Sequence, residues 1–170
     1  MQNIYLVGMM GSGKTVTGRK LAKMTGGDFV DLDEVIETKN QQSIPEIFKQ
    51  KGESFFRLEE SIVLKEMAAK QNCVIATGGG IVLEGNNVEL MRRTGQVVYL
   101  KGSLDVLWER VCIKNNRPLL DNDDPQGSLA KIQKERETMY QKASHCEIDT
   151  DHQSAEAVAK KIIKALENLK

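Results

Sequence analysis

The stretch GMMGSGKT, residues 8–15, constrains the fold of this chain more than any other feature of its sequence. It matches the pattern G-x-x-x-x-G-K-[ST], whose defined positions are Gly8, Gly13, Lys14 and Thr15. The apolar run IYLV precedes it directly, and the amphipathic stretch KTVTGRKLAKM follows it. A strand, a glycine-rich loop and a helix in this order predict a phosphate-binding loop (P-loop). The alternative is an ordinary glycine-rich turn into a helix.

Each part of the pattern has a physical role in binding a triphosphate. Glycines let successive backbone N–H groups turn inward and form an anion-binding nest. The helix that follows points its positive dipole end at the same place. Lys14 can reach the β- and γ-phosphates, and the Thr15 hydroxyl can ligate Mg²⁺. A GTPase would need a guanine-reading motif such as NKxD, and the sequence contains none.

Composition narrows the class of protein. The 170 residues suit a single domain, residues 1–170, and 24 basic against 24 acidic side chains give no net charge. That balance disfavours a general nucleic-acid binder. Cys73, Cys112 and Cys146 lie far apart, which predicts free thiols in a reducing compartment. The start lacks a signal-peptide pattern and no apolar run approaches the ~20 residues of a membrane span, so we expect a soluble, cytoplasmic protein.

Short apolar runs alternate with amphipathic segments along the chain. Strands are predicted at Ile4–Val7, Phe29–Leu32, Cys73–Ala76, Val97–Leu100 and Cys146–Ile148. Helices are predicted at 14–24, 53–71, 86–95, 103–114, 128–143 and 155–170. Alternating strands and helices predict an α/β fold with a parallel sheet covered on both faces. Residues 114–128, with two prolines, a glycine and four Asp or Asn residues at 121–124, predict a long loop of the kind that forms lids.

Two carboxylates follow the second predicted strand in the stretch FVDLDEVIE. Asp31 and Asp33 are two residues apart, so in an extended chain they share a face. Ligands of open α/β sheets bind at the carboxyl ends of the strands. Both carboxylates are therefore candidates to face the phosphate site, one toward a metal and one toward an acceptor hydroxyl. Helix capping by Asp31 with Glu34, or by Asp33 itself, explains the same spacing equally well.

Three glycines, Gly78, Gly79 and Gly80, follow the third predicted strand in the stretch VIATGGGIV. Residues without a Cβ let a ligand approach the main chain closely. The alternative is a loose turn from a strand into a helix.

These stretches, taken in order, resemble the shikimate kinase family. The resemblance rests on GMMGSGKT, DLD at 31–33, FFRLEE at 55–60, GGG at 78–80, RPLL at 117–120 and RETMY at 136–140. It implies a P-loop fold like that of nucleoside-monophosphate kinases, with three layers, a five-stranded parallel sheet, acceptor-binding helices at about 33–61 and a lid at about 114–128. It also implies ATP-dependent phosphorylation of the 3-hydroxyl of shikimate, with Mg²⁺, in aromatic amino acid biosynthesis. We expect the protein to be a monomer.

Residue roles follow from the same resemblance. Asp33 would bind the acceptor hydroxyls and either orient or deprotonate the attacking one. Asp31 would hold Mg²⁺ together with Thr15. The shikimate carboxylate would be bound by Arg57 and Arg136, because a planar guanidinium pairs with a carboxylate through two hydrogen bonds. The remaining implied contacts are Gly78, Gly79 and Gly80 with shikimate, Met10, Gly11, Ser12, Gly13 and Lys14 with ATP, Arg110 and Gln153 at the adenine end, and Arg117 closing on the phosphates.

Simpler interpretations exist for several of these side chains. Arg57 and Glu60 are three residues apart, like a weak surface ion pair, and Arg136 lies in the charged run KERE, which is typical of a solvated face. Core packing is the first interpretation of Phe48 and Phe56, although either could form a wall of the substrate pocket. His145 and His152 lack metal-ligand spacing, so we expect structural or exposed roles.

Two rival functions stay open at this point. A kinase of another small hydroxylated acid, such as gluconate, would share the P-loop and differ in the acceptor pocket. A regulatory P-loop module would bind nucleotide without transferring phosphate.

Overall fold

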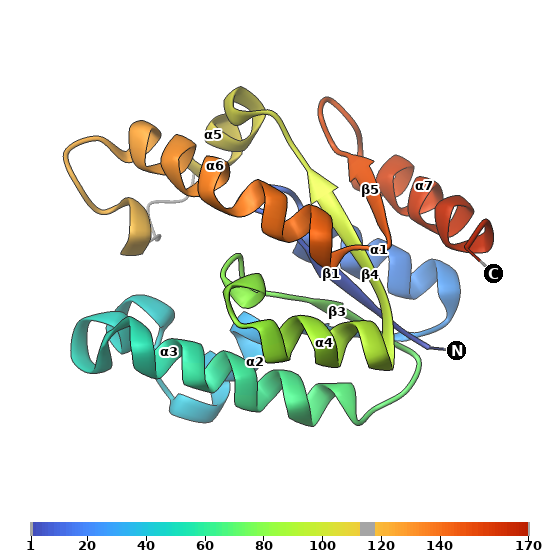
Figure 1. Ribbon diagram of the computed structural model, residues 1–170, viewed down its shortest axis with the longest axis horizontal. Helices are drawn as coiled ribbons and strands as arrows, with labels where there is room; N and C mark the ends of the chain where they lie inside the picture. The colour runs from blue at the N-terminus through green and yellow to red at the C-terminus, as the bar shows by residue number, and fades with distance from the viewer. Residues whose placement is uncertain (1, 113–117, 170) are drawn as a thin grey trace.

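A computed structural model of the chain describes residues 2–112 and 118–169. The strands are β1 (Asn3–Val7), β2 (Asp28–Asp31), β3 (Cys73–Ala76), β4 (Gly95–Lys101) and β5 (Cys146–Asp149). They form one sheet in the order β2-β3-β1-β4-β5, and each neighbouring pair is parallel (Figure 1). The predicted five-stranded parallel sheet is confirmed. Each predicted strand is present; the bounds of β3 are as predicted, and those of the other four differ by one or two residues.

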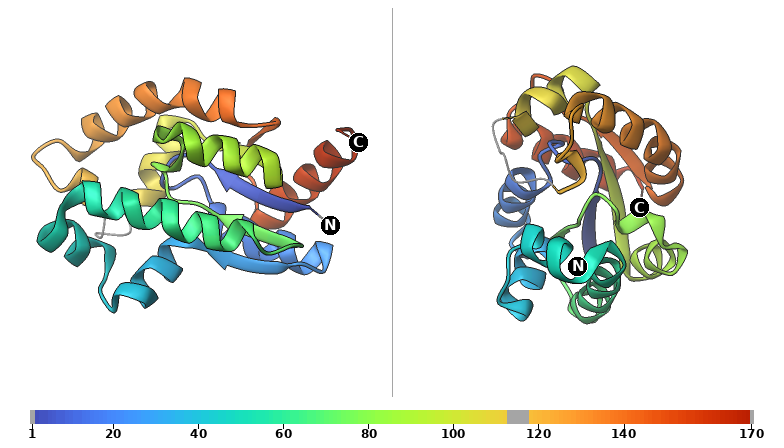
Figure 2. Two further views of the ribbon diagram at one scale, coloured as in Figure 1. Left: turned by 60° about the horizontal axis from the view of Figure 1, so that its bottom comes forward. Right: turned by 90° about the vertical axis from the view of Figure 1, so that its left-hand side faces the viewer.

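Helices cover both faces of the sheet, which gives the three predicted layers (Figures 1 and 2). On one face, α1 and α7 pack against each other. On the other face lie α3, α4 and α6. The α-helices are α1 (Lys14–Thr25), α2 (Leu32–Asn40), α3 (Ile44–Ala68), α4 (Gly85–Thr94), α5 (Leu104–Cys112), α6 (Pro125–Ala143) and α7 (Ala155–Glu167), and two short 3₁₀ helices are η1 (Ile81–Leu83) and η2 (Pro118–Leu120).

The central strand β1 is apolar because both of its faces are buried. Ile4 and Leu6 pack into the core beneath α1 and α7, while Tyr5 and Val7 pack into the core on the opposite face. This alternation follows from the two-residue repeat of a strand, and strands buried on both faces are continuous hydrophobic runs. The consequence is a rigid strand whose carboxyl end leads directly into the glycine-rich loop.

The second strand ends one residue earlier than predicted, because a helix begins at Leu32. The side chain of Asp31 accepts a hydrogen bond from the backbone N–H of Asp33 at 3.1 Å and so caps α2. The capping interpretation of Asp31 is therefore confirmed. Glu34, the other member of the suggested capping box, pairs with Arg19 at 2.6 Å.

Helix α3 begins at Ile44, nine residues before the predicted start at residue 53. Ser43 and Glu46 form a capping box, with the Glu46 carboxylate accepting from the Ser43 backbone N–H at 2.8 Å. Gly52 then interrupts the helix with φ 81° and ψ 171°, a conformation that favours glycine. The sequence periodicity captured only the segment after this break.

Helix α6 also begins earlier than predicted, since Pro125 to Ser128 form its first turn rather than the end of the loop. Asp124 caps this turn by accepting a hydrogen bond from the Gly127 backbone N–H at 2.9 Å. Proline is well suited to the position after an N-cap because it has no N–H to leave unpaired. The Asp-Pro pair is therefore a helix start and not part of the loop.

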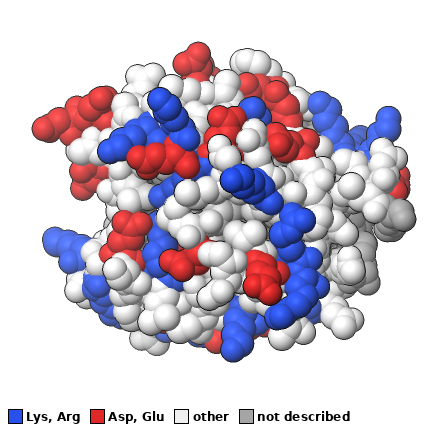
Figure 3. Space-filling view, viewed as in Figure 1, with Lys and Arg blue, Asp and Glu red and all other residues white. Residues whose placement is uncertain are grey.

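Charged side chains of both signs are interspersed on the face that Figure 3 shows. Within residues 2–112 and 118–169, no helix combines the length and apolar character needed to cross a bilayer.

His145 has the structural role that its sequence context suggested. Its ring Nδ1 atom accepts a hydrogen bond from the Val97 backbone N–H at 2.9 Å, and the His145 backbone N–H donates to the Val97 carbonyl at 2.8 Å. Burial and the nearby Arg92 charge lower the pKa of His145 below its usual value. His152 is exposed, and the described residues contain no cluster of metal ligands.

We predict that His145 makes folding stability sensitive to acid. The folded state favours the neutral ring, so its contribution is complete above the unfolded pKa of about 6.5 and is lost as the pH falls below it. The unfolding free energy of the wild type should therefore decline relative to that of His145→Asn, which does not titrate. Urea titrations between pH 8 and pH 5 measure this, with His152→Asn as the exposed control. Parallel pH curves for wild type and His145→Asn would refute the assignment.

Candidate active site

The glycine-rich loop follows β1 and has a backbone that only glycine adopts easily. Gly8, Gly11 and Gly13 have φ values of 144°, 81° and 88°. A Cβ on Gly8 would lie 2.5 Å from the carbonyl oxygen of Leu100, so there is also no space for one. Gly13 precedes the first residue of α1. The predicted order of strand, loop and helix is present, with three loop glycines at positive φ.

Two cations contact the loop from different elements. The Lys14 Nζ atom donates to the carbonyl oxygens of Gly8 at 2.8 Å and Met9 at 2.9 Å. Arg110, on α5, donates from Nη1 to the Gly11 carbonyl at 3.2 Å. The ammonium group therefore lies against the loop whose geometry suits phosphate, and the guanidinium ties the loop to α5.

The side-chain oxygens of Thr15 and Asp31 lie together beside the loop. The Thr15 hydroxyl donates to Asp31 Oδ2 at 2.7 Å. The Asp31 carboxylate therefore both caps α2 and faces the P-loop, so the two sequence interpretations hold together. The described residues contain no group of three or more His, Cys, Asp or Glu side chains placed to hold a metal. Mg²⁺ is commonly bound by one or two protein oxygens plus substrate phosphates and water, and this pair fits that pattern.

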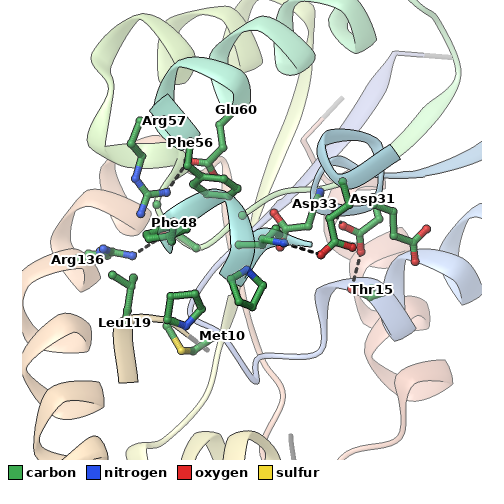
Figure 4. Close-up of a pocket in the computed structure, with 18 residues that line it drawn as sticks. Met10, Thr15, Asp31, Asp33, Phe48, Phe56, Arg57, Glu60, Leu119 and Arg136 are labelled. Carbon is green, nitrogen blue, oxygen red and sulfur yellow. Dashed lines mark hydrogen bonds and ion pairs between the residues drawn. The ribbon is translucent and has the colours of Figure 1, made fainter. Parts of the chain in front are cut away.

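A cavity of about 360 Å³ opens beside the P-loop at the carboxyl ends of the strands (Figure 4). We call it the acceptor cavity. Its walls come from the P-loop, the β2–α2 junction, α2, α3, the turn formed by Gly78, Gly79 and Gly80 (the glycine turn), η2 and α6. They comprise Met10, Thr15, Asp31, Asp33, Glu34, Glu37, Ile44, Pro45, Phe48, Phe56, Arg57, Glu60, Gly78, Gly79, Gly80, Pro118, Leu119 and Arg136.

Both carboxylates of the DLD stretch line this cavity, as predicted. The reason differs from the prediction, since Asp33 lies in the first turn of α2 rather than on a strand. The turn capped by Asp31 directs Asp33 toward the centre of the cavity, whereas Asp31 lies beside Thr15 (Figure 4). The two carboxylates therefore have separate places, Asp33 facing the cavity and Asp31 beside Thr15.

Arg57 forms a buried ion-pair network and not the surface pair suggested as its simpler interpretation. Its Nη1 atom donates to Glu60, and its Nη2 atom donates to Glu53 at 2.9 Å. The side chains of Arg57 and Glu60 are only 13% and 1% exposed. Burial raises the pKa of Glu60 to about 7, although the Arg57 charge acts in the opposite direction. A Cβ on Gly80 would overlap the guanidinium of Arg57, which explains why glycine stands there.

Arg136 is 7% exposed, so the solvated-face interpretation of KERE is wrong for this residue. Its Nη1 atom donates to the Gly79 carbonyl at 3.2 Å. It approaches the cavity from α6, and Arg57 approaches from α3 (Figure 4). The two guanidinium groups, distant in sequence, therefore line one cavity together with the glycine turn.

Phe48 and Phe56 form an apolar wall of the acceptor cavity as well as packing against the core. Their ring centroids are 4.9 Å apart. Both roles considered for them are thus present. The cavity is lined by two arginines, by the five carboxylates of Asp31, Asp33, Glu34, Glu37 and Glu60, and by an aromatic wall. The arginines can bind an anionic group, the carboxylates can accept hydrogen bonds from hydroxyl groups, and the aromatic wall suits an apolar face of a small ligand.

The residues predicted at the adenine end meet at the loop after β5. Arg110 donates from Nη2 to the Thr150 carbonyl at 2.8 Å, and the Gln153 backbone N–H donates to the same carbonyl at 3.4 Å. Their contacts with adenine stay predictions. Arg117 lies outside the described residues, while Pro118 and Leu119, which follow it, line the acceptor cavity.

Sequence reasoning did not include Glu60 or Tyr140 among the site residues. A signal for both existed, because Glu60 lies three residues after Arg57 and Tyr140 four after Arg136, on the same helix faces. Met10 was assigned to the nucleotide, yet it also lines the acceptor cavity.

Comparison with known proteins assigns the family. The family model described as shikimate kinase matches residues 10–167 of the chain. The chain belongs to the shikimate kinase family. A shikimate kinase of Thermodesulfovibrio yellowstonii is 44% identical over 169 residues, covering 99% of this chain and 97% of that protein.

Solved structures of the family agree with this assignment. Shikimate kinase from Acinetobacter baumannii, solved in complex with shikimate, matches with a TM-score of 0.97 and 39% identity, covering 100% of this chain and 95% of that chain. A gluconokinase from Sinorhizobium meliloti matches with a TM-score of 0.59 and 15% identity over 99% of this chain and 93% of that chain. At that identity the gluconokinase shares the fold alone.

Proposed function

We propose that this chain is a shikimate kinase, which transfers the γ-phosphoryl group of ATP to the 3-hydroxyl of shikimate and releases ADP and shikimate 3-phosphate. The observation that carries this proposal is the pairing of a P-loop with an adjacent cavity that contains the buried Arg136, the largely buried Arg57 and Asp33. Family membership and the close match to a shikimate-bound relative support the choice of acceptor. The reaction belongs to aromatic amino acid biosynthesis.

Asp33 and the two arginines bind different groups of the acceptor. Arg57 and Arg136 bind the shikimate carboxylate, which orients the ring within the cavity. Asp33 accepts a hydrogen bond from the attacking hydroxyl and orients it toward the phosphate. Gly78, Gly79 and Gly80 let the substrate approach the main chain because they carry no side chain.

Residues of the P-loop bind and polarise the nucleotide. The backbone N–H groups of the P-loop and the Lys14 ammonium stabilise the negative charge on the β- and γ-phosphates during phosphoryl transfer. The oxygens of Thr15 and Asp31 would hold Mg²⁺, which neutralises phosphate charge when bound. Arg117, in the segment predicted to be a lid, would close on the phosphates and exclude water.

We further propose that the enzyme acts as a cytoplasmic monomer. The acceptor cavity described here is built within a single chain, so no second copy is needed to complete it. Cys73, Cys112 and Cys146 are free thiols, which suits a reducing compartment.

An ADP-release assay with a panel of acceptors tests the proposal. We expect ADP release that depends on both Mg²⁺ and shikimate, with shikimate 3-phosphate identified by ³¹P NMR. Preference for gluconate over shikimate would support the rival kinase. Tight ATP binding without ADP release for any acceptor would support a regulatory module and contradict the proposed function.

A further inference from the structure

Two side chains of α6 converge on one carbonyl oxygen in the glycine turn. The Tyr140 hydroxyl donates to the Gly79 carbonyl at 2.5 Å, and Arg136 Nη1 donates to the same oxygen at 3.2 Å. Tyr140 and Arg136 are four residues apart and so lie on one face of the helix. A carbonyl oxygen has two lone pairs, so it can accept both bonds at once.

Tyr140 is built into the core in a way that fixes its hydroxyl. Its side chain is fully buried, and its ring stacks on Tyr99 with centroids 5.1 Å apart and an interplanar angle of 23°. Burial raises the pKa of Tyr140 to about 12, so the hydroxyl keeps its proton near neutral pH. The phenol is therefore a rigid, permanent donor to Gly79.

The backbone N–H groups of the glycine turn have a different environment from the Gly79 carbonyl. Among the described residues, neither the Gly79 nor the Gly80 backbone N–H donates to a protein acceptor. Both residues line the acceptor cavity. The Gly79 carbonyl and the Gly80 N–H belong to one planar trans peptide and point in opposite directions. Holding the carbonyl against α6 therefore determines the direction of the Gly80 N–H.

The turn also lies against the P-loop. A Cβ built on Gly79 would be 3.7 Å from the Gly8 carbonyl oxygen, the Met10 nitrogen and the Tyr140 hydroxyl oxygen. Gly79 is therefore located where the P-loop, the glycine turn and α6 meet. A tilt of this peptide would change the position of the acceptor relative to the phosphate donor.

We propose that Tyr140 is a positioning residue for acceptor recognition, which acts by orienting the Gly79–Gly80 peptide and by sharing the Gly79 carbonyl with Arg136. This inference rests on the proposed function. Tyr140 itself does not line the acceptor cavity among the residues that the structure describes. Its effect on shikimate passes through the glycine turn.

Steady-state kinetics of Tyr140→Phe test the proposal, because this change keeps the ring and removes the hydroxyl. A lost hydrogen bond predicts a fall in kcat/KM for shikimate of about threefold to tenfold, with the KM for ATP unchanged. The matched control is Tyr99→Phe, which removes the hydroxyl of the stacked partner and should leave both values at the wild-type level. A lower melting temperature with wild-type kcat/KM for shikimate would show a merely structural hydroxyl and overturn the proposal, as would equal losses toward both substrates.

A second measurement does not depend on the reaction. Amide NMR spectra of the ligand-free proteins should show shifted Gly79 and Gly80 resonances in Tyr140→Phe and unshifted ones in Tyr99→Phe. Unchanged glycine amides in Tyr140→Phe would overturn the positioning role even if shikimate is the substrate. Conversely, a wild type inactive toward shikimate with clear shifts at both glycines would reject the proposed function while supporting the orientation of the turn.

Discussion

Replacing Lys14 with methionine is expected to lower kcat by about a hundredfold to a thousandfold, a range typical for removal of one transition-state donor. Methionine retains an unbranched side chain but carries no charge. The Lys14 ammonium lies at the loop, where it donates to the Gly8 and Met9 carbonyls, and from there it can reach the β- and γ-phosphates. Only a cation at that place stabilises the charge that develops during transfer.

The measurement is shikimate-dependent ADP release, together with thermal melting of the same samples. Lys20→Met is the matched control, since Lys20 is exposed on the same helix and does not line the acceptor cavity. We expect wild-type melting in both variants and wild-type turnover in Lys20→Met alone. Near-normal turnover of a well-folded Lys14→Met variant would remove the P-loop from the active site.

Loss of either cavity arginine should reduce kcat/KM for shikimate by about tenfold to a hundredfold, because a hydrogen bond to a charged group contributes about 1.5–3 kcal/mol. Arg57→Lys and Arg136→Lys retain the charge but lack the planar fork that binds a carboxylate through two bonds. Both guanidinium groups lie against the glycine turn, Arg57 beside Gly80 and Arg136 on the Gly79 carbonyl. A flexible ammonium group cannot reproduce these contacts.

The decisive comparison is between the two substrates. ATP affinity measured without an acceptor should stay at the wild-type value in both variants, and Arg93→Lys, an exposed change on α4, should alter nothing. An analogue of shikimate whose carboxylate is reduced to an alcohol should be a poor substrate of the wild type. If both variants use shikimate as well as the wild type does, or if the analogue is used equally well, the carboxylate-binding role is wrong.

The sequence predicts the nucleotide half of the site because that half is local. Eight consecutive residues form the P-loop, and the residues on either side belong to a strand and a helix with clear periodicity. The order of apolar runs and amphipathic segments was also enough to predict the parallel sheet. These features depend on neighbours along the chain, and the structure confirms them.

Helix starts were predicted less well where polar caps decide them. Ser43 and Asp124 each begin a helix earlier than the apolar periodicity suggests, and Asp31 begins a helix, α2, that the periodicity did not predict. A cap acts through one or two hydrogen bonds to backbone N–H groups, which leave little trace in a hydrophobic pattern. Gly52 has the opposite effect to a cap, because this single residue interrupts α3, whose two parts otherwise form one continuous helix.

The acceptor half of the site depends on tertiary packing. Spacing alone places Glu60 on the same face of a helix as Arg57, but it cannot tell a buried pair from a solvated one. Packing of α3 and α6 around the glycine turn buries Arg57, Glu60 and Arg136, and that burial raises the pKa of Glu60. The sequence by itself thus determined the fold class and the phosphate loop, which follow from local pattern. Only the tertiary structure decided which charged side chains leave water and meet in one cavity, because burial depends on contacts between segments far apart in the chain.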